Sequence, residues 1–180
     1  MNIEVKVSQK IGLNVGSGHE PEPGWVNVDL RAINGFVDIK ASVCELPFRD
    51  RQFQWIKAES VLEHLSDPRP AIGELARLIE FDGLVEIRIP ALGTNAAHLD
   101  PTHKYLADLK HWVELIEEQF LDVNVKSVGV RWRYHKSLVL LQYFMIRILG
   151  FHELGQCWVI RAGKPREESI RIIPKRWWID

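Results

Sequence analysis

The chain has 180 residues, of which 46% are hydrophobic and 26% are charged, and this composition fits one globular domain with its own core. Its 23 Lys and Arg residues against 24 Asp and Glu residues leave a formal charge of −1, so no overall field draws the protein to nucleic acid or to an anionic membrane. Two cysteines, Cys44 and Cys157, are too few for a disulfide framework and lack the paired spacing of a zinc site, which favours a reducing, cytoplasmic location.

The first part of the chain consists of short apolar runs separated by Gly, Pro and Asn, a pattern typical of β-strands. Strands are predicted at residues 11–15, 25–30, 36–39 and 53–58. Residues 66–68, Ser-Asp-Pro, then offer a capping side chain followed by a proline, and this order predicts that a helix begins there.

That helix has an apolar face with the spacing i, i+3, i+4 and i+7. The face consists of Ile72, Leu75, Ala76 and Ile79. We expect the charged residues Glu74, Arg77 and Glu80 to face away from the core. Asp82-Gly83 is predicted to turn the chain into a fifth strand at 84–89, which we expect to be covered on both faces.

The second part of the chain alternates helices and strands. A helical stripe runs from Leu109 to Phe120, and it is followed by a strand at 121–125, an apolar helix at 138–149 and a strand at 156–162. The helix at 138–149 is shorter than the roughly 20 residues that span a bilayer, so we interpret it as a buried helix and favour a homodimer through its surface. No transmembrane segment and no export signal are predicted.

Strands that alternate with helices predict an α/β fold with a largely parallel sheet, and such a sheet binds ligands at the carboxyl ends of its strands. One such end is the glycine turn at residues 16–18, and another is Asp29, where a carboxylate can accept hydrogen bonds from both hydroxyls of a ribose. A dinucleotide site needs a third glycine and a helix after the turn. Pro21 and Pro23 exclude that helix, so a nucleoside cofactor without a bound phosphate fits the turn better.

Several ordered blocks between residues 11 and 120 carry a family resemblance. They read LNVGSG, GWVNVDL, LPFRDRQFQWI, SVLEHLSDPRPAIGELARLIEFDGLVEIRIP and DPTHKYL. Together they resemble the class I S-adenosylmethionine-dependent methyltransferases, in particular a small branch with LNxGxG and GWxNxD strands. The resemblance implies a single methyltransferase-like domain over residues 1–180, with a three-layer Rossmann-like sheet that is mostly parallel and has an antiparallel last strand. The short connections near the N-terminus imply that some of the family's N-terminal helices are missing.

The resemblance also implies which residues bind S-adenosyl-L-methionine. These are Gly16, Ser17, Gly18, Asp29, Leu30, Cys44, Glu45, Leu46, Glu59 and Ser60. In the family, the glycine turn passes under the amino-acid part and ribose of the cofactor. The acid after the second strand binds the ribose, and the loop at 44–46 flanks adenine. The residues after the fourth strand form the floor beneath the methyl group.

Methyl transfer requires close positioning of the acceptor and sometimes a base that removes its proton. His103 and His64 are the candidate catalytic residues, because both follow strands at the expected ligand edge and histidine titrates near neutral pH. The alternative for His64 is a purely structural hydrogen bond to its loop. His98, Asp100 and His103 do not have the spacing of a regular metal motif, so no metal is predicted.

The sequence therefore predicts a methyltransferase that uses an O or N atom of a small-molecule acceptor, which the resemblance suggests is glycan-related. One alternative is an inactive methyltransferase-like binding or regulatory subunit, favoured by Ser42 and Gln54, which depart from the family pattern. Another is a nucleotide-dependent oxidoreductase. Residues 131–136 mix cations and aromatics, and Trp177-Trp178 lies in a basic tail, but neither gives a strong nucleic-acid signal.

Overall fold

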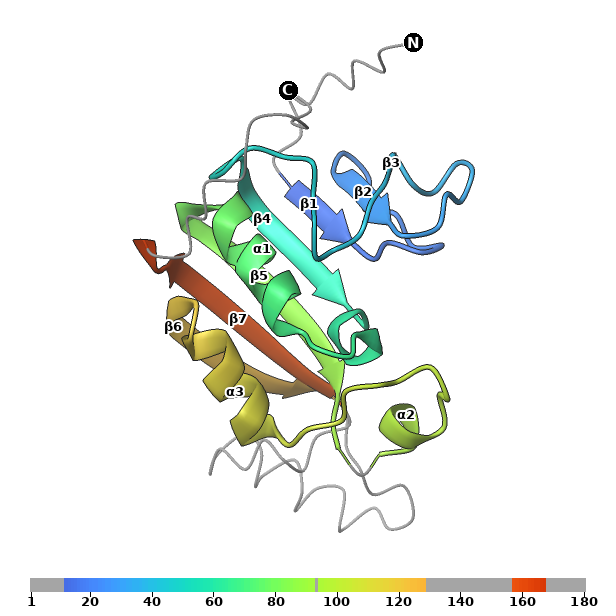
Figure 1. The fold of residues 1–180 in the computed structure, drawn as a ribbon, viewed down its shortest axis with the longest axis vertical. Coiled ribbons are helices and arrows are strands. Elements are labelled where there is room, and N and C mark those ends of the chain that lie inside the picture. The colour runs from blue at the N-terminus through green and yellow to red at the C-terminus, as the bar shows by residue number, and fades with distance from the viewer. Residues whose placement is uncertain (1–11, 93, 129–156, 168–180) are drawn as a thin grey trace.

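The computed structural model describes residues 12–92, 94–128 and 157–167, and within them seven strands form one sheet (Figure 1). The strands are β1 (Gly12–Val15), β2 (Val26–Asp29), β3 (Ile39–Lys40), β4 (Phe53–Glu59), β5 (Ile79–Pro90), β6 (Phe120–Val128) and β7 (Cys157–Pro165). Their order across the sheet is β3-β2-β1-β4-β5-β7-β6. Neighbouring strands from β3 to β5 are parallel, whereas β7 runs antiparallel to both β5 and β6. This arrangement confirms the predicted mostly parallel α/β sheet with an antiparallel last strand.

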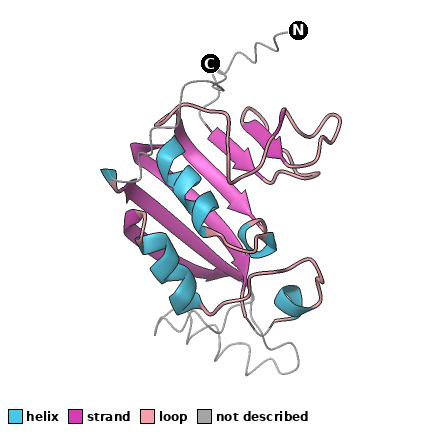
Figure 2. Cartoon of the chain, in the orientation of Figure 1, coloured by secondary structure: helices cyan, strands magenta, loops and turns pink. Residues whose placement is uncertain are grey.

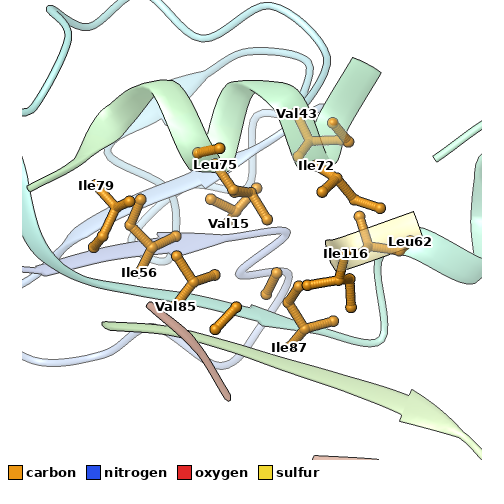
Figure 3. Close-up of a cluster of buried hydrophobic side chains, with 14 of the residues drawn as sticks. Val15, Val43, Ile56, Leu62, Ile72, Leu75, Ile79, Val85, Ile87 and Ile116 are labelled. Atoms are coloured by element: carbon orange, nitrogen blue, oxygen red, sulfur yellow. The ribbon is translucent and has the colours of Figure 1, made fainter. Parts of the chain in front are cut away.

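The described helices lie between the later strands. They are η2 (Leu62–His64), α1 (Arg69–Leu78), α2 (Asn95–His98) and α3 (Leu109–Glu117). Helices α1 and α3 contact each other and cover the same face of the sheet (Figure 2). The main core lies between that face and the helices. Figure 3 shows Ile72 and Leu75 of α1 beside Val15, Ile56 and Val85 of the sheet.

The opposite face of the sheet is polar along its central strands, and no described helix covers it. In β5 the buried residues Val85 and Ile87 alternate with Glu86, which pairs with Arg161 of β7 at 2.9 Å. The prediction that this strand is covered on both faces is therefore wrong for the described part of the chain. A second helical layer, the third layer of the prediction, is not present among the described residues.

The connection between β1 and β2 contains no helix, which confirms the prediction that N-terminal helices are missing. Two buried amides hold this connection against the sheet. The Asn14 amide donates to Asn27 Oδ1 at 3.0 Å and to the Glu20 carbonyl at 3.0 Å, and Asn27 Oδ1 also accepts from the Glu22 amide at 2.8 Å. The Asn14 and Asn27 side chains thus form hydrogen bonds with backbone groups of this connection. If a helix joined the two strands, such groups would be paired within the helix. Strand β3 is only two residues long.

Two local details differ from the sequence prediction. The N-cap of α1 is Pro68, whose ring carries no hydrogen-bonding group, and Asp67 Oδ1 accepts from the Arg69 amide just before the helix. Strand β5 begins at Ile79, directly after α1 and earlier than predicted, but its continuous pairing with β4 starts only at Leu84, after the predicted bend at Asp82-Gly83, where Gly83 lies against the Ile79 side chain. The register of β5 against β4 shifts between Phe53 and Trp55, and this irregularity accommodates the early start of the strand.

Several sequence features lie outside the described residues. They are the apolar helix at 138–149 with its predicted homodimer contact, the cation and aromatic run at 131–136, and the Trp177-Trp178 tail. Within the residues that are described, no helix has the length and apolar character needed to cross a membrane.

Candidate functional site

The ligand edge of the sheet is the edge at which the parallel strands end. Figure 1 shows the arrows of β1, β2, β4 and β5 pointing to it. The glycine turn follows β1 there, and Gly16 has a φ of 67°. A Cβ atom at Gly16 would lie 2.2 Å from Cγ2 of Val61, which belongs to the loop after β4. Glycine is therefore required at this position both by its backbone conformation and by the approach of Val61.

Asp29 connects the end of β2 to the glycine turn. Its Oδ2 accepts from the Gly18 amide at 3.0 Å, and its Oδ1 accepts from the Arg31 amide at 2.8 Å. A carboxylate has about four acceptor sites, so each oxygen keeps a further lone pair for a ligand. The structure thus brings together Gly18 and Asp29, two of the predicted cofactor residues, at one edge of the sheet.

Ser17 is the one residue of the glycine turn with a side chain. Its amide donates to the Val28 carbonyl at 3.0 Å, which fixes the turn against β2. The hydroxyl oxygen is buried and has no hydrogen-bond partner among the described residues. A buried hydroxyl without a partner is unfavourable, so this atom is suited to a hydrogen bond with a bound ligand. Leu30 follows Asp29 and is 66% exposed at the same edge.

The predicted adenine loop at 44–46 divides into buried and exposed positions. Leu46 is buried in the core, and its amide donates to Glu74 Oε2 at 2.9 Å. Glu45 is exposed and Cys44 is half-buried, and burial raises the pKa of the Cys44 thiol. Leu46 therefore anchors the loop, and Cys44 and Glu45 are the members of this segment that are accessible to a ligand.

The adenine loop is held by a buried ion pair on α1. Arg77 is 1% exposed, and its Nε and Nη2 each donate to one oxygen of Glu74 at 2.8 Å. Arg77 Nη2 also donates to the Leu46 carbonyl at 3.1 Å, and its Nη1 donates to the Phe48 carbonyl and to Asp50, both at 2.8 Å. The expectation that Glu74 and Arg77 face away from the core is wrong, because together they satisfy the backbone of the loop that α1 covers.

Strand β4 ends in a residue that belongs to a charged pair. Glu59 bonds to Arg88 of β5 and lies 3.1 Å from Lys57 Nζ, so its carboxylate is already engaged. The Ser60 amide donates to the Arg88 carbonyl at 3.0 Å, and the Ser60 backbone has a φ of 52°. This conformation turns the chain sharply away from the sheet and into η2.

Helix η2 meets the loop after α2. The Glu63 carbonyl accepts from the amides of Lys104 and Tyr105 at 2.8 and 3.0 Å, and this contact docks the second loop onto the first. The rings of His64 and His103 consequently meet edge to face, with their centroids 4.7 Å apart. The two predicted catalytic histidines therefore lie together, in one cluster with the Glu63 side chain. We call Glu63, His64 and His103 the acid–histidine cluster.

The hydrogen bonds of the cluster define which ring nitrogens are free. His103 Nδ1 lies 2.9 Å from the Ala97 carbonyl, which can only accept, so Nδ1 is the donor. His64 Nδ1 lies 3.0 Å from Thr102 Oγ1, and that hydroxyl donates its own proton to Asp100 Oδ1 at 2.5 Å. His64 Nδ1 must therefore donate as well. In the neutral state of both rings, Nε2 carries the free lone pair.

Glu63 was not among the residues predicted from the sequence. It is 1% exposed, and neither of its carboxylate oxygens has a hydrogen-bond partner among the described residues. Burial raises the pKa of its carboxyl to about 7. The available sequence signal was the position of a carboxylate directly after the apolar pair Val61-Leu62, where a purely structural residue would be uncharged.

The comparisons with known proteins agree with this fold. Residues 18–87 match the family model described as a methyltransferase domain. The fold is similar to a SAM-dependent methyltransferase from Archaeoglobus fulgidus, with a TM-score of 0.59 and 16% identity over 89% of this chain and 90% of the other. A possible histamine N-methyltransferase from Thermotoga maritima has a TM-score of 0.61 and 14% identity, over 85% of this chain and 81% of its own.

Phosphoethanolamine N-methyltransferase 2 from Haemonchus contortus, in complex with S-adenosyl-L-methionine, is also similar. Its TM-score is 0.57 and its identity is 16%, over 86% of this chain and 48% of the other. No protein of curated function matches the sequence significantly. Residues 18–87 thus match a methyltransferase domain, and the chain has the fold of S-adenosylmethionine-dependent methyltransferases, which agrees with the predicted fold.

Proposed function

We propose that this chain transfers the methyl group of S-adenosyl-L-methionine to an oxygen or nitrogen atom of a small-molecule acceptor, and that the cofactor binds across the glycine turn and Asp29. The observation that carries the proposal is the hydrogen bond between the Gly18 amide and Asp29 Oδ2, because it places a side-chain-free turn and a carboxylate side by side. The adenosine ribose has two neighbouring hydroxyls, and both can donate to the remaining acceptor sites of Asp29.

The residues present fit this cofactor without a phosphate site. In the described structure, no helix directly follows the glycine turn, so no helix N-terminus is available there to hold a pyrophosphate. The buried Ser17 hydroxyl can bond a polar group of the amino-acid part of the cofactor. Leu30, Cys44 and Glu45 are the accessible predicted residues that would border adenine. These features disfavour the oxidoreductase alternative and support an adenosyl ligand.

The acceptor would approach from the side of η2. Bound S-adenosyl-L-methionine supplies an electrophilic methyl carbon on a positively charged sulfur. The acceptor's lone pair forms a bond to that carbon as the carbon–sulfur bond breaks, and the sulfur takes the electron pair. In the described structure, the groups that would face the acceptor are His64, His103 and Glu63. His103 would take the proton that the acceptor loses, provided that no other group is bound at these three residues. A glycan-related acceptor remains part of this proposal.

Replacing Asp29 by alanine should raise the dissociation constant of S-adenosyl-L-methionine by more than about tenfold, since hydrogen bonds to a charged group contribute about 1.5–3 kcal/mol. The Asp29→Asn variant keeps an oxygen that can accept from Gly18 but loses the charge, so its dissociation constant should lie between those of the wild type and Asp29→Ala. Isothermal titration calorimetry measures all three. Asp122→Ala, at an exposed ion pair on β6, is the matched control and should bind as the wild type does.

The same calorimeter separates the three functions under consideration. Binding of S-adenosyl-L-methionine and S-adenosylhomocysteine, without binding of NAD, supports the methyltransferase. Binding of NAD alone supports the oxidoreductase. If none of the three ligands binds, the chain is a methyltransferase-like subunit that has lost its cofactor, and the proposal is wrong. An Asp29→Ala protein that binds the cofactor as tightly as the wild type would rule out the assigned site.

A further inference from the structure

We propose that Glu63, His64 and His103 bind a divalent first-row transition-metal ion at the carboxyl end of β4. One carboxylate oxygen and one ring nitrogen from each histidine all lie within 4.8 Å of one another. Small rotations of the side chains bring these atoms to the separations, at most about 4.4 Å, that ligands about 2.0–2.2 Å from one ion allow. The three residues come from η2 and from the loop after α2, which the hydrogen bonds to the Glu63 carbonyl hold together.

The two histidines are already oriented as metal ligands are. A histidine that binds a metal nearly always donates its second ring N–H to a carbonyl, a carboxylate or a comparable acceptor, and this bond sets the tautomer and the ring direction. His103 Nδ1 donates to the Ala97 carbonyl. His64 Nδ1 donates to Thr102, whose hydroxyl is in turn held by Asp100. Both rings therefore offer a free Nε2 lone pair from a fixed position.

The carboxylate gives a second and independent reason for an ion. Glu63 is almost fully buried, yet neither oxygen has a hydrogen-bond partner among the described residues. An isolated buried carboxylate is strongly unfavourable, and the usual solutions are protonation, a paired charge or a coordinated metal. No Lys or Arg side chain is hydrogen-bonded to Glu63 in the described structure, and the rings of His64 and His103 lie beside it. A cation shared by the three residues satisfies the carboxylate and uses both free lone pairs.

The donor set indicates the kind of ion. Two imidazoles and one carboxylate suit Zn²⁺ or a similar first-row ion, whereas Mg²⁺ and Ca²⁺ prefer all-oxygen sites. Three protein ligands leave at least one coordination position open, as in catalytic sites. Asp100 Oδ2 lies 3.8 Å from His103 Nε2, close enough to orient a water on the ion.

The metal site adds to the proposed function, because it narrows the class of methyl acceptor. This part of the inference rests on the proposed methyl transfer. An open position on the ion suits an acceptor oxygen, and a bound cation lowers the pKa of a coordinated hydroxyl. The hydroxyl proton would then pass to solvent water, and the resulting alkoxide oxygen would form its bond to the methyl carbon as the carbon–sulfur bond breaks. Under this assignment the histidines hold the ion and do not themselves remove the proton. The acceptor is accordingly a hydroxyl-bearing molecule and not an amine.

Titration of chelator-treated full-length protein with Co²⁺ tests the site directly. The wild type should show the visible absorption of Co²⁺ bound to nitrogen and oxygen ligands with a stoichiometry of one, and Zn²⁺ should displace it. Glu63→Gln and His103→Asn should each weaken Zn²⁺ binding at least tenfold. His98→Asn, on the neighbouring helix α2, is the matched control and should bind as the wild type does. Mg²⁺ should not compete.

Thermal unfolding gives a second measurement that does not depend on activity. Zn²⁺ should raise the Tm of the wild type and leave that of Glu63→Gln unchanged, since an ion stabilises only the folded state that binds it. Absence of the Co²⁺ band in the wild type, or an undiminished band in both cluster variants, overturns the metal site. Cofactor calorimetry is independent of this outcome, so a failed metal site leaves the proposed function with His103 as the direct proton acceptor.

Discussion

Replacing Arg77 by leucine should lower the free energy of unfolding by about 3–5 kcal/mol, the usual effect of removing one partner from a buried ion pair. The substitution leaves the buried Glu74 carboxylate without its bidentate partner. It also removes the donors that satisfy the carbonyls of Leu46 and Phe48. Urea unfolding followed by circular dichroism measures the change. Because the adenine loop loses its anchor, cofactor affinity should fall as well.

Arg69→Leu, on the same helix, is the matched control for this prediction. Arg69 is exposed, and its ion pair among the described residues is with exposed Asp67, so its replacement should change stability by no more than about 0.5 kcal/mol. The double variant Glu74→Leu, Arg77→Leu removes both buried charges and should recover part of the lost stability. Equal losses in Arg77→Leu and Arg69→Leu would show that the buried pair does not hold the loop.

Replacing Gly16 by alanine should lower the free energy of unfolding by about 2–4 kcal/mol, from the strain of a left-handed backbone and from overpacking. The added Cβ would lie 2.2 Å from Val61 Cγ2, so the glycine turn or the loop after β4 must move. Either movement displaces groups that we assign to the cofactor. We therefore expect weaker binding of S-adenosyl-L-methionine in calorimetry together with the loss of stability in urea.

Gly18→Ala separates the two causes. Gly18 also has a positive φ, of 49°, but no atom lies within 4 Å of the position that its Cβ would occupy. Its replacement should therefore show the strain alone, about 1–2 kcal/mol. Adding Val61→Ala to Gly16→Ala should relieve the close contact and restore part of the stability. The steric explanation is wrong if Gly16→Ala and Gly18→Ala lose the same stability and the double variant shows no recovery.

The order of elements along the chain was predictable because each has a local signal. Apolar runs bounded by Gly and Pro predicted the strands from β1 to β5, and the spacing of Ile72 and Leu75 predicted α1. The glycine turn and Asp29 were likewise predictable as neighbours, since both follow parallel strands at the same edge. What the sequence did not predict was that β5 already begins at Ile79, before the bend at Asp82-Gly83, because this start depends on pairing with Phe53 of the neighbouring strand β4.

The roles of Glu74, Arg77 and Glu63 could not be read from periodicity. A helical pattern assigns charged side chains to the solvent side, and this is right unless another segment brings backbone carbonyls that need donors. The loop at 46–50 brings such carbonyls to Arg77, and it is remote from α1 in the sequence. Glu63 meets His103 only because the loop after α2 docks on the Glu63 carbonyl. Such contacts follow from tertiary packing, and the periodicity of one segment does not reveal the partner that another segment brings.

The position of β7 has a consequence for how the protein forms. Strand β7 is the last of the described strands, yet it lies between β5 and β6 and pairs with both. On a ribosome, the two earlier strands emerge first and must wait, each with an unpaired edge, until residues up to Pro165 have been synthesised. Contacts so distant in sequence form slowly, and open edges favour association with other chains. The nascent polypeptide is therefore most prone to aggregation in the interval before β7 is inserted.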